Sequence, residues 1–447
     1  MRACLLLILG AVCFCCAMRF WQFWFGFHRY GYDILSHVFT VVYFVWEILR
    51  SKRVRLQSSI REILLHWWVF FGIALLSAVL LSFRGAGGLS WMQYIKNTVA
   101  LFGWMAFLST FVRFAGMLQE SERSWLINVY VAGVICSCVF EMAEVSLAAL
   151  SGFDLVWFVF EPISYQGRFY QVEEKTLYEW AGFFRANGFA GTNTQGIYVA
   201  TIVPLLLERL MAKKSWRHYV LLVIALVGIF LTMSRSAIVA TIVGIFVIGV
   251  RYPKRWPVIG ALLVLIALPL YFIGSRAAED IGKIAQSRSN VDASRVEMYR
   301  DALWRFRENP AGLGWGQYYV EFVDSGSESM DQNPHNSWLR VLVELGAIGL
   351  LQQIIMYGFL TCRLARNRSV LASSSLAAMF GLFAAACFNE VLNEFYAFLF
   401  IILFSTCALQ QSDSERLRRG ASRVALPGIN RKQVVYADAP KVRPLLN

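Results

Sequence analysis

One side chain suited to proton transfer stands at the start of an apolar segment. His335 is one of five histidines in the 447 residues, and it follows Pro334 and opens the run HNSWLRVLVELGAIG. The first turn of a helix exposes backbone N–H groups and carries a positive dipole, which attract phosphate and disfavour an imidazolium. His335 is therefore either a neutral base that accepts a proton or an interfacial histidine that only hydrogen-bonds the helix end.

Three arginines are candidates for holding an anion near this histidine. Arg235 lies in LTMSRSAIV, in a turn of two or three residues between apolar segments, where a charge is costly unless water or an anion meets it. Arg185 lies in FRANGF, just before another apolar segment. The alternative for both is contact with lipid headgroups. Arg295 opens an amphipathic segment and is otherwise a solvated charge. Guanidinium groups pair well with phosphate oxygens, so together these residues would suit a diphosphate leaving group and a base.

Sequence motifs for metal or nucleotide binding are missing from the chain. It contains no glycine-rich P-loop and no HExxH helix, and the segments expected to face outwards hold no DxD carboxylate pair. Glu390 and Glu394 in NEVLNE form the nearest acidic pair, which would either pair with the arginines or lie in a hydrated turn. All nine cysteines fall in or beside apolar segments, which predicts neither a disulfide nor a zinc site. We expect no metal and no cofactor.

Membrane helices must position these residues. The chain is 57% hydrophobic and only 16% charged, which is more apolar surface than a soluble protein of this length can bury, and each membrane span needs about 20 apolar residues. The predicted fold class is an all-α polytopic membrane protein with about 12 transmembrane helices. The expected spans are residues 3–26, 31–49, 64–83, 93–116, 124–150, 192–211, 218–233, 235–250, 256–275, 336–361, 369–388 and 391–411. The first has no convincing cleavage site, so we expect a span and not a signal peptide.

The distribution of basic residues predicts the orientation. Lys and Arg are concentrated in alternate connections, at residues 50–62, 118–124, 211–218, 251–256, 362–369 and after residue 411. Basic loops of membrane proteins face the cytoplasm. Both termini are therefore expected on the cytoplasmic side, and His335 and the arginines on the outer side. The net charge of +13 reflects this pattern and makes nucleic acid an improbable partner.

Two outward segments, residues 151–191 and 276–335, are too long to be simple turns. In the second, apolar residues at spacings of three and four predict an amphipathic helix, with Ser294 and Glu297 as a capping box. The expected apolar face is Val296, Tyr299, Leu303 and Phe306.

Pro310 and three glycines (Gly312, Gly314 and Gly316) are expected to end that helix in a turning loop. The transmembrane domain, including both outward segments, is expected to cover residues 1–411. Residues 412–447 are polar and basic, and are expected to form a disordered cytoplasmic tail.

Five motifs resemble, in their order, those of one superfamily. They are RANGFAGTN, MSRSA, SRVEMYRDALWRF, ENPAGLGWGQY and HNSWLRVLVELGAIGLL, and the chain is similar in this order to the O-antigen ligase and polymerase superfamily. The HN-x-x-L…E-x-G-x-x-G and P-x-G-x-G elements are the most specific. The resemblance covers roughly residues 180–410, and the first five spans match by topology only. Within the superfamily, the chain looks most like the O-antigen ligases of Gram-negative bacteria.

This resemblance implies a GT-C-like fold and a transferase that uses neither metal nor ATP. Such ligases move polysaccharide from undecaprenyl diphosphate to the lipid A–core oligosaccharide, on the periplasmic face of the inner membrane. By motif, His335 corresponds to the family's essential histidine and Arg235 to the arginine of its SR turn. Arg295 corresponds to the arginine that opens the loop helix, and Arg185 matches a further arginine more loosely.

The roles that follow from the resemblance are a base and a set of diphosphate ligands. We expect His335 to take the proton of an acceptor hydroxyl while the arginines stabilise the leaving diphosphate, in a single inverting displacement. Asn336 is expected to bind a sugar hydroxyl or to orient the helix start.

Three other functions stay open. An O-antigen polymerase joins two undecaprenyl-linked chains. An oligosaccharyltransferase that glycosylates protein serine or threonine usually has a longer C-terminal region than this chain. A twelve-span transporter or flippase would show two related halves and polar residues near mid-membrane, whereas here the candidate residues gather on one side and the halves look unalike.

Overall fold

The described part of the chain is helical apart from one hairpin. The structure is a computed structural model that describes residues 1–16, 31–50, 58–84, 91–151, 155, 178–180, 183–186, 192–257, 259–264, 296–316, 318, 336–389, 391–392, 397 and 399–410. The hairpin pairs β1 (Tyr178–Trp180) with β2 (Phe183–Arg185) in antiparallel register, and it is the exception to the predicted all-α fold.

Most of the helices follow predicted apolar segments. The segment 192–211 is divided between two helices, and α1 covers only the first part of the segment 3–26, whose residues 17–26 lie outside the described part of the chain. Residues 256–257, 259–264, 296–308 and 399–410 are helical as well. The others are α1 (Arg2–Cys15), α3 (Gly31–Leu49), α4 (Ser58–Arg84), α5 (Trp91–Ala115), α6 (Glu120–Ser151), α8 (Thr192–Ala200), α9 (Val203–Ala212), α10 (Trp216–Thr232), α11 (Arg235–Arg251), the short 3₁₀ helix η2 (Pro253–Arg255), α15 (Ser337–Ala365) and α16 (Val370–Ala386).

Three of these helical stretches are long and apolar enough to cross a membrane: Glu120–Ser151, Asn193–Ala212 and Ser337–Ala365. Shorter apolar helices accompany them, among them α10 and α16. The architecture is that of a helical membrane protein, and the count of about twelve spans stays a prediction. The expected tail, residues 412–447, lies outside the described residues.

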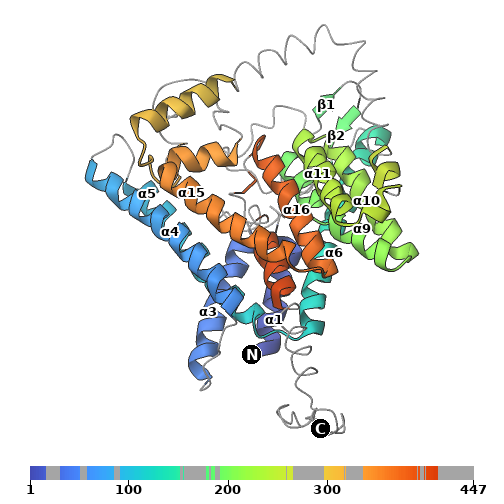
Figure 1. The fold of residues 1–447 in the computed structure, drawn as a ribbon, viewed down its shortest axis with the longest axis horizontal. Helices are drawn as coiled ribbons and strands as arrows, with labels where there is room; N and C mark the ends of the chain where they lie inside the picture. Colours follow the sequence, from blue (N-terminus) through green and yellow to red (C-terminus); the bar gives the residue numbers. More distant parts are fainter. Residues whose placement is uncertain are drawn as a thin grey trace.

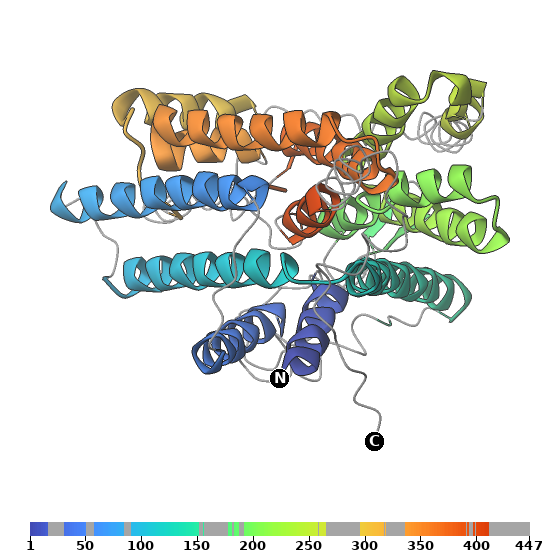
Figure 2. The ribbon, with the colours of Figure 1, turned by 60° about the horizontal axis from the view of Figure 1, so that its bottom comes forward.

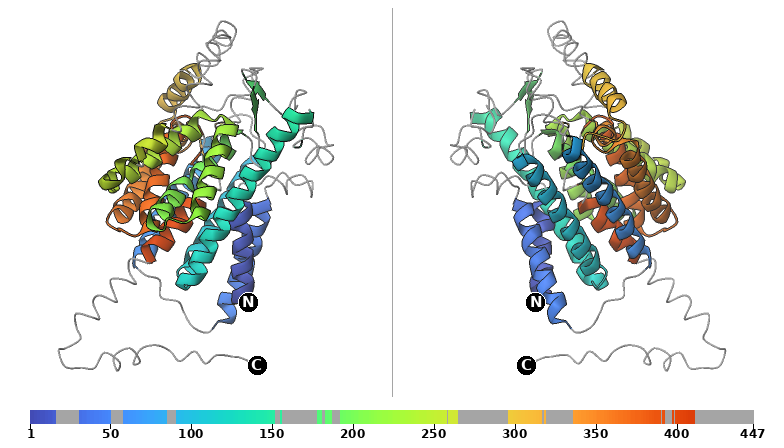
Figure 3. Two further views of the ribbon diagram at one scale, coloured as in Figure 1. Left: turned by 90° about the vertical axis from the view of Figure 1, so that its right-hand side faces the viewer. Right: turned by 90° about the vertical axis from the view of Figure 1, so that its left-hand side faces the viewer.

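The helices lie side by side with the two ends of the bundle clearly separated. In Figure 2, α15, α4, α5 and α3 follow one another in that order, and each packs on the next. Figure 1 shows the N-terminus at the lower end and the hairpin β1–β2 at the upper end. The side views of Figure 3 place helix 296–308 at the upper end too.

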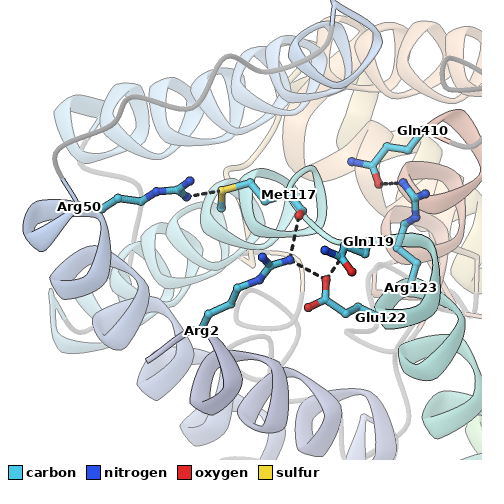
Figure 4. A network of polar contacts seen from close by, with 7 residues as sticks. All are labelled: Arg2, Arg50, Met117, Gln119, Glu122, Arg123 and Gln410. Carbon is cyan, nitrogen blue, oxygen red and sulfur yellow. Dashed lines mark hydrogen bonds and ion pairs between the residues drawn. The ribbon is translucent and has the colours of Figure 1, made fainter. Parts of the chain in front are cut away.

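Polar contacts at the lower end join segments that the basic residues predict to share one side. Arg2 donates to the carbonyl oxygen of Met117 (3.2 Å) and forms an ion pair of 2.7 Å with Glu122 (Figure 4). Arg123 donates to Gln410 Oε1 at 2.8 Å, next to the end of the last described helix. The start of the chain, the α5–α6 connection and residue 410 therefore meet at this end.

Two further connections reach the same end. Asn367, which follows α15, donates its amide to the carbonyl oxygen of Ala408 at 2.8 Å. Arg251, the last residue of α11, donates to the carbonyl oxygen of Asn367. These contacts agree with the prediction that segments 118–124, 251–256 and 362–369 share one side.

Helix 296–308 packs on the first part of α15 through a small apolar cluster of its own. Four buried residues form it (Ala302, Leu313, Tyr318 and Val343), with Phe306 and Leu339 packed against them. The predicted amphipathic face is therefore only partly right. Val296 and Leu303 are exposed (51% and 45%). The helix contacts α15 through the face that carries Ala302, whose small side chain allows the two helices to approach closely. Ser294, of the predicted capping box, lies outside the described residues.

Candidate active site

The elements that carry the predicted site residues meet at the upper end of the bundle. Arg185 is the last residue of β2, and the next residue, Ala186, donates its backbone N–H to the carbonyl oxygen of Leu231 at 2.9 Å. Leu231 lies in the last turn of α10, just before Arg235. The hydrogen bond therefore brings β2, which ends in Arg185, to the turn between α10 and α11 (Figure 1).

Arg235 is the first residue of α11 and its side chain is exposed. The turn before it consists of Met233, in the left-handed conformation (φ 47°), and Ser234. Its length is within the predicted two or three residues, but Arg235 itself, which was expected in the turn, begins the helix. Ser234 caps α11, because its hydroxyl oxygen accepts a hydrogen bond from the backbone N–H of Ala237 at 3.4 Å. Arg235 therefore lies at the N-terminal, positive end of α11. An anion there would interact with the guanidinium group and with the helix dipole.

A close helix contact fixes this turn from below. A Cβ on Gly196 of α8 would lie 2.5 Å from Thr232 Oγ1 and 3.1 Å from Ser234 Cβ. Glycine is therefore needed at position 196, because any larger residue would keep α8 away from the turn between α10 and α11. The N-termini of α8 and α11 lie at the same end of the bundle.

The start of α15 reaches this end through α16. Ala377 and Gly381 of α16 lie against Gly244 and Ala240 of α11, respectively, so the two helices are antiparallel and the end of α16 adjoins the start of α11. Asn336 donates its amide to the carbonyl oxygen of Cys387, just after α16, at 3.2 Å.

Asn336 also caps α15. Its Oδ1 accepts hydrogen bonds from the backbone N–H groups of Trp338 and Leu339, each at 3.0 Å. Ser337 next to it donates to the carbonyl oxygen of Asn389 at 3.0 Å. Both ends of the Asn336 amide thus contact backbone, which fits the predicted role of orienting the helix start. Its contact with a sugar stays an untested prediction.

Several predicted site residues lie outside what the structure describes. These are His335, Arg295, Glu390 and Glu394. Arg185 is described for its backbone alone, as part of β2. The segments 151–191 and 276–335 are also mostly outside. The structure therefore brings together the β2 end, Arg235 and Asn336. His335 is covalently bonded to Asn336, and Arg295 immediately precedes helix 296–308.

Two pairs of ionisable residues near this end, three of them fully buried glutamates, were not predicted. Arg340 Nε donates to Glu344 Oε1 at 3.0 Å, and Glu344 is fully buried in α15. In α6, Glu141 and Glu144 are fully buried, and Glu141 faces Gly228 of α10. Their signal in the sequence is a charge inside an apolar segment, at helical spacing to a second charge.

These features are those of a helical membrane protein. Two helix N-termini, an exposed arginine and a second arginine on the adjoining strand lie together at the upper end of the bundle, and this combination suits a phosphate group. Residues 220–352 match the family described as O-antigen ligase. This match makes that part of the chain similar to the O-antigen ligase and polymerase superfamily. No curated protein matches the chain.

Proposed function

We propose that the chain is an O-antigen ligase, which transfers polysaccharide from undecaprenyl diphosphate to a sugar of lipid A–core oligosaccharide. The observation that carries this proposal is the O-antigen ligase match over residues 220–352. It contains Arg235, Arg295 and the pair His335–Asn336, that is, every predicted site residue except Arg185. The structure supports a common site, because the elements of Arg235 and Asn336 meet at one end.

The site faces the periplasm in this proposal. The lower end gathers the basic connections that the positive-inside rule assigns to the cytoplasm. The starts of α11 and α15, which carry Arg235 and Asn336, lie at the opposite end, together with the hairpin β1–β2 (Figure 3). A periplasmic enzyme has no ATP at hand, so the energy of the transfer comes from the diphosphate-linked donor.

The reaction is a single displacement at the anomeric carbon of the donor. The acceptor oxygen forms a bond to that carbon, the bond from the carbon to the diphosphate oxygen breaks, and the hydroxyl proton goes to His335. Attack from the face opposite the leaving group inverts the anomeric configuration. The leaving diphosphate keeps the electron pair of the broken bond.

The arginines stabilise the charge that develops on the diphosphate. Arg235 has a planar guanidinium group and lies at the N-terminus of α11, so the side chain and the helix dipole favour an anion at the same place. Arg185 and Arg295 are assigned as further ligands of the diphosphate. Asn336 fixes the first turn of α15 and with it the residue before it, His335. The long lipid lies against the membrane helices of a GT-C-like fold.

A deletion strain with plasmid-borne variants tests the assignment. Loss of a ligase leaves lipopolysaccharide without O-antigen and accumulates long undecaprenyl-linked polymer. Loss of a polymerase leaves a core that carries at most one repeat unit. We expect the first pattern, restored by the wild-type chain and not by His335→Ala. The second pattern would assign the chain to the polymerases of the same superfamily.

A further inference from the structure

The helix α15 is broken at Gly346, and a loop fills the break. Gly346 has φ 69° and ψ −172°, so the helix in fact consists of residues 337–345 and a longer second part. The carbonyl oxygens of Val343 and Glu344 accept hydrogen bonds from the backbone N–H groups of Leu313 (2.8 Å) and Gly314 (2.7 Å). Non-helical backbone is tolerated at a membrane helix where other backbone satisfies it.

The loop and the break fit together through two glycines. A Cβ on Gly312 (φ 91°) would overlap the carbonyl oxygen of Glu344 and lie 2.6 Å from Gly346 N. A Cβ on Gly346 would overlap the carbonyl oxygen of Pro310 and lie 2.7 Å from the carbonyl carbon of Ala311. Both positions also have the left-handed backbone that favours glycine. The contact therefore requires glycine on both sides. We call Gly312, Gly314, Gly346 and Glu344 the glycine clamp.

Glu344 holds the clamp with its side chain as well as its backbone. Its carbonyl oxygen accepts from Gly314, and its fully buried carboxylate accepts from Arg340 Nε at 3.0 Å. Arg340 lies one turn after the cap residue Asn336. Removing one partner of an ion pair that is shielded from water is costly, because the other charge is left buried without a partner. Glu344 thus connects the clamp with the first turn of α15.

The clamp joins the two helices whose starts carry the proposed base and a proposed diphosphate ligand. Helix 296–308 leads directly into the loop 310–316, and the cluster of Ala302 and Val343 holds it on α15. His335 immediately precedes the cap of α15, and Arg295 immediately precedes helix 296–308. Any tilt of residues 337–345 relative to helix 296–308 changes the separation of these two starts.

We propose that Gly312, Gly346 and Glu344 are positioning residues that set the spacing between the start of α15 and the start of helix 296–308, the two starts that His335 and Arg295 directly precede in the sequence. This inference rests on the proposed function, in which His335 takes the proton and Arg295 binds the diphosphate. A displacement of about 1 Å at reacting groups costs up to about a hundredfold in rate. Donor binding depends on several arginines and the helix ends, so it tolerates the change better than the chemical step does.

The experiment compares Gly312→Ala, Gly346→Ala and Glu344→Gln with the full-length wild type and a matched control. The control is Gly358→Ala, in the second part of the same helix, where an added Cβ meets nothing within 4 Å. Hydrogen exchange followed by mass spectrometry reads the clamp directly, in peptides that cover residues 309–316 and 337–346. A reconstituted assay with purified undecaprenyl diphosphate-linked polysaccharide and lipid A–core measures kcat and the donor KM.

We expect the clamp variants to exchange faster in both peptides and to lose at least tenfold in kcat, with the donor KM within threefold of wild type. The control Gly358→Ala should match wild type in exchange rate, kcat and donor KM. A kcat that stays within threefold of wild type despite faster exchange would overturn the positioning role, as would unchanged exchange. Glu344→Gln adds no atoms at the backbone contact, so it keeps the test decisive if an alanine variant does not fold. Absence of transfer by the wild type would instead overturn the ligase assignment and the spacing role with it, while the exchange result would still report on the clamp.

Discussion

The backbone N–H of Ala186 donates a hydrogen bond of 2.9 Å to the carbonyl oxygen of Leu231. This bond holds the end of β2, and therefore the backbone of Arg185, beside the turn from which Arg235 emerges. Two arginines far apart in the sequence thus belong to one end of the bundle. A diphosphate with several charged oxygens is large enough to contact more than one guanidinium.

The topology predicts the side on which a reporter is active. Alkaline phosphatase folds only outside the cytoplasm, so a fusion near residue 320 should be active and a fusion near residue 365 inactive. At the lower end, Asn367 donates to the carbonyl oxygen of Ala408 in helix 399–410, and this helix contacts Arg123 through Gln410. Arg2 contacts the same α5–α6 connection through Glu122. The reverse pattern of activity would put His335 in the cytoplasm and overturn the site.

The arginines should not tolerate a substitution that keeps their charge. Arg235→Lys and Arg295→Lys retain a cation and lose the planar fork, so we expect transfer to fall about tenfold or more with normal protein levels. Arg217→Lys is the matched control, because Arg217 is exposed near the start of α10 at the other end of the bundle. Full activity of both site variants would reduce these arginines to interfacial anchors.

His335→Ala should separate catalysis from donor binding. A general base contributes about 10²–10⁴-fold in rate, whereas the arginines and helix ends supply much of the affinity for diphosphate. Transfer in the reconstituted assay should fall by that factor, and binding of the lipid-linked donor should stay near wild type. Activity within a few-fold of wild type would remove His335 from the role of base.

Chelation of divalent ions should leave the activity unchanged. The proposed leaving-group ligands are guanidinium groups, which need no metal to stabilise a diphosphate. The measurement is the transfer rate after treatment with EDTA and after return of magnesium or manganese. A strict, restorable requirement for either ion would contradict this mechanism and direct attention to Glu390 and Glu394.

The packing of α16 on α11 predicts an effect on stability. A Cβ on Gly381 would lie 2.5 Å from the carbonyl oxygen of Ala240, so Gly381→Val forces the two helices apart. Overpacking of this kind costs about 1–3 kcal/mol. We expect a lower thermal midpoint in detergent, and no change for Gly72→Ala, where an added Cβ meets nothing within 4 Å. Equal midpoints for both would show that α11 and α16 are not in close contact.

Local rules predicted the helices and the turn of Arg235 well. The apolar run 235–250 became α11 (Arg235–Arg251), and the two-residue turn before it follows from its short polar sequence. The predicted helix end before Pro310 is confirmed, because the helix stops at residue 308. All these features depend on residues close together in the chain, where side-chain period and helix-ending residues suffice.

Features that depend on distant partners were not predictable in this way. The break at Gly346 lies in a continuous apolar run, and its cause is the loop 310–316, which supplies the missing hydrogen-bond donors. The contact face of helix 296–308 centres on Ala302 because α15 lies there. In the sequence Gly312 and Gly346 are unrelated positions. In the structure each lies so close to the backbone of the other segment that a Cβ at either position would overlap it.

The anchoring of the chain on both sides of residues 319–334 has an evolutionary consequence. Tyr318 is buried in the cluster on α15 and Asn336 is hydrogen-bonded at both ends of its amide. The entropic cost of connecting two fixed points of a chain grows only with the logarithm of the number of residues between them, so insertions and deletions between these anchors are expected to cost little stability. This stretch is where descendants of one ancestral protein can diversify in the acceptors they bind while the proposed catalytic groups are inherited unchanged.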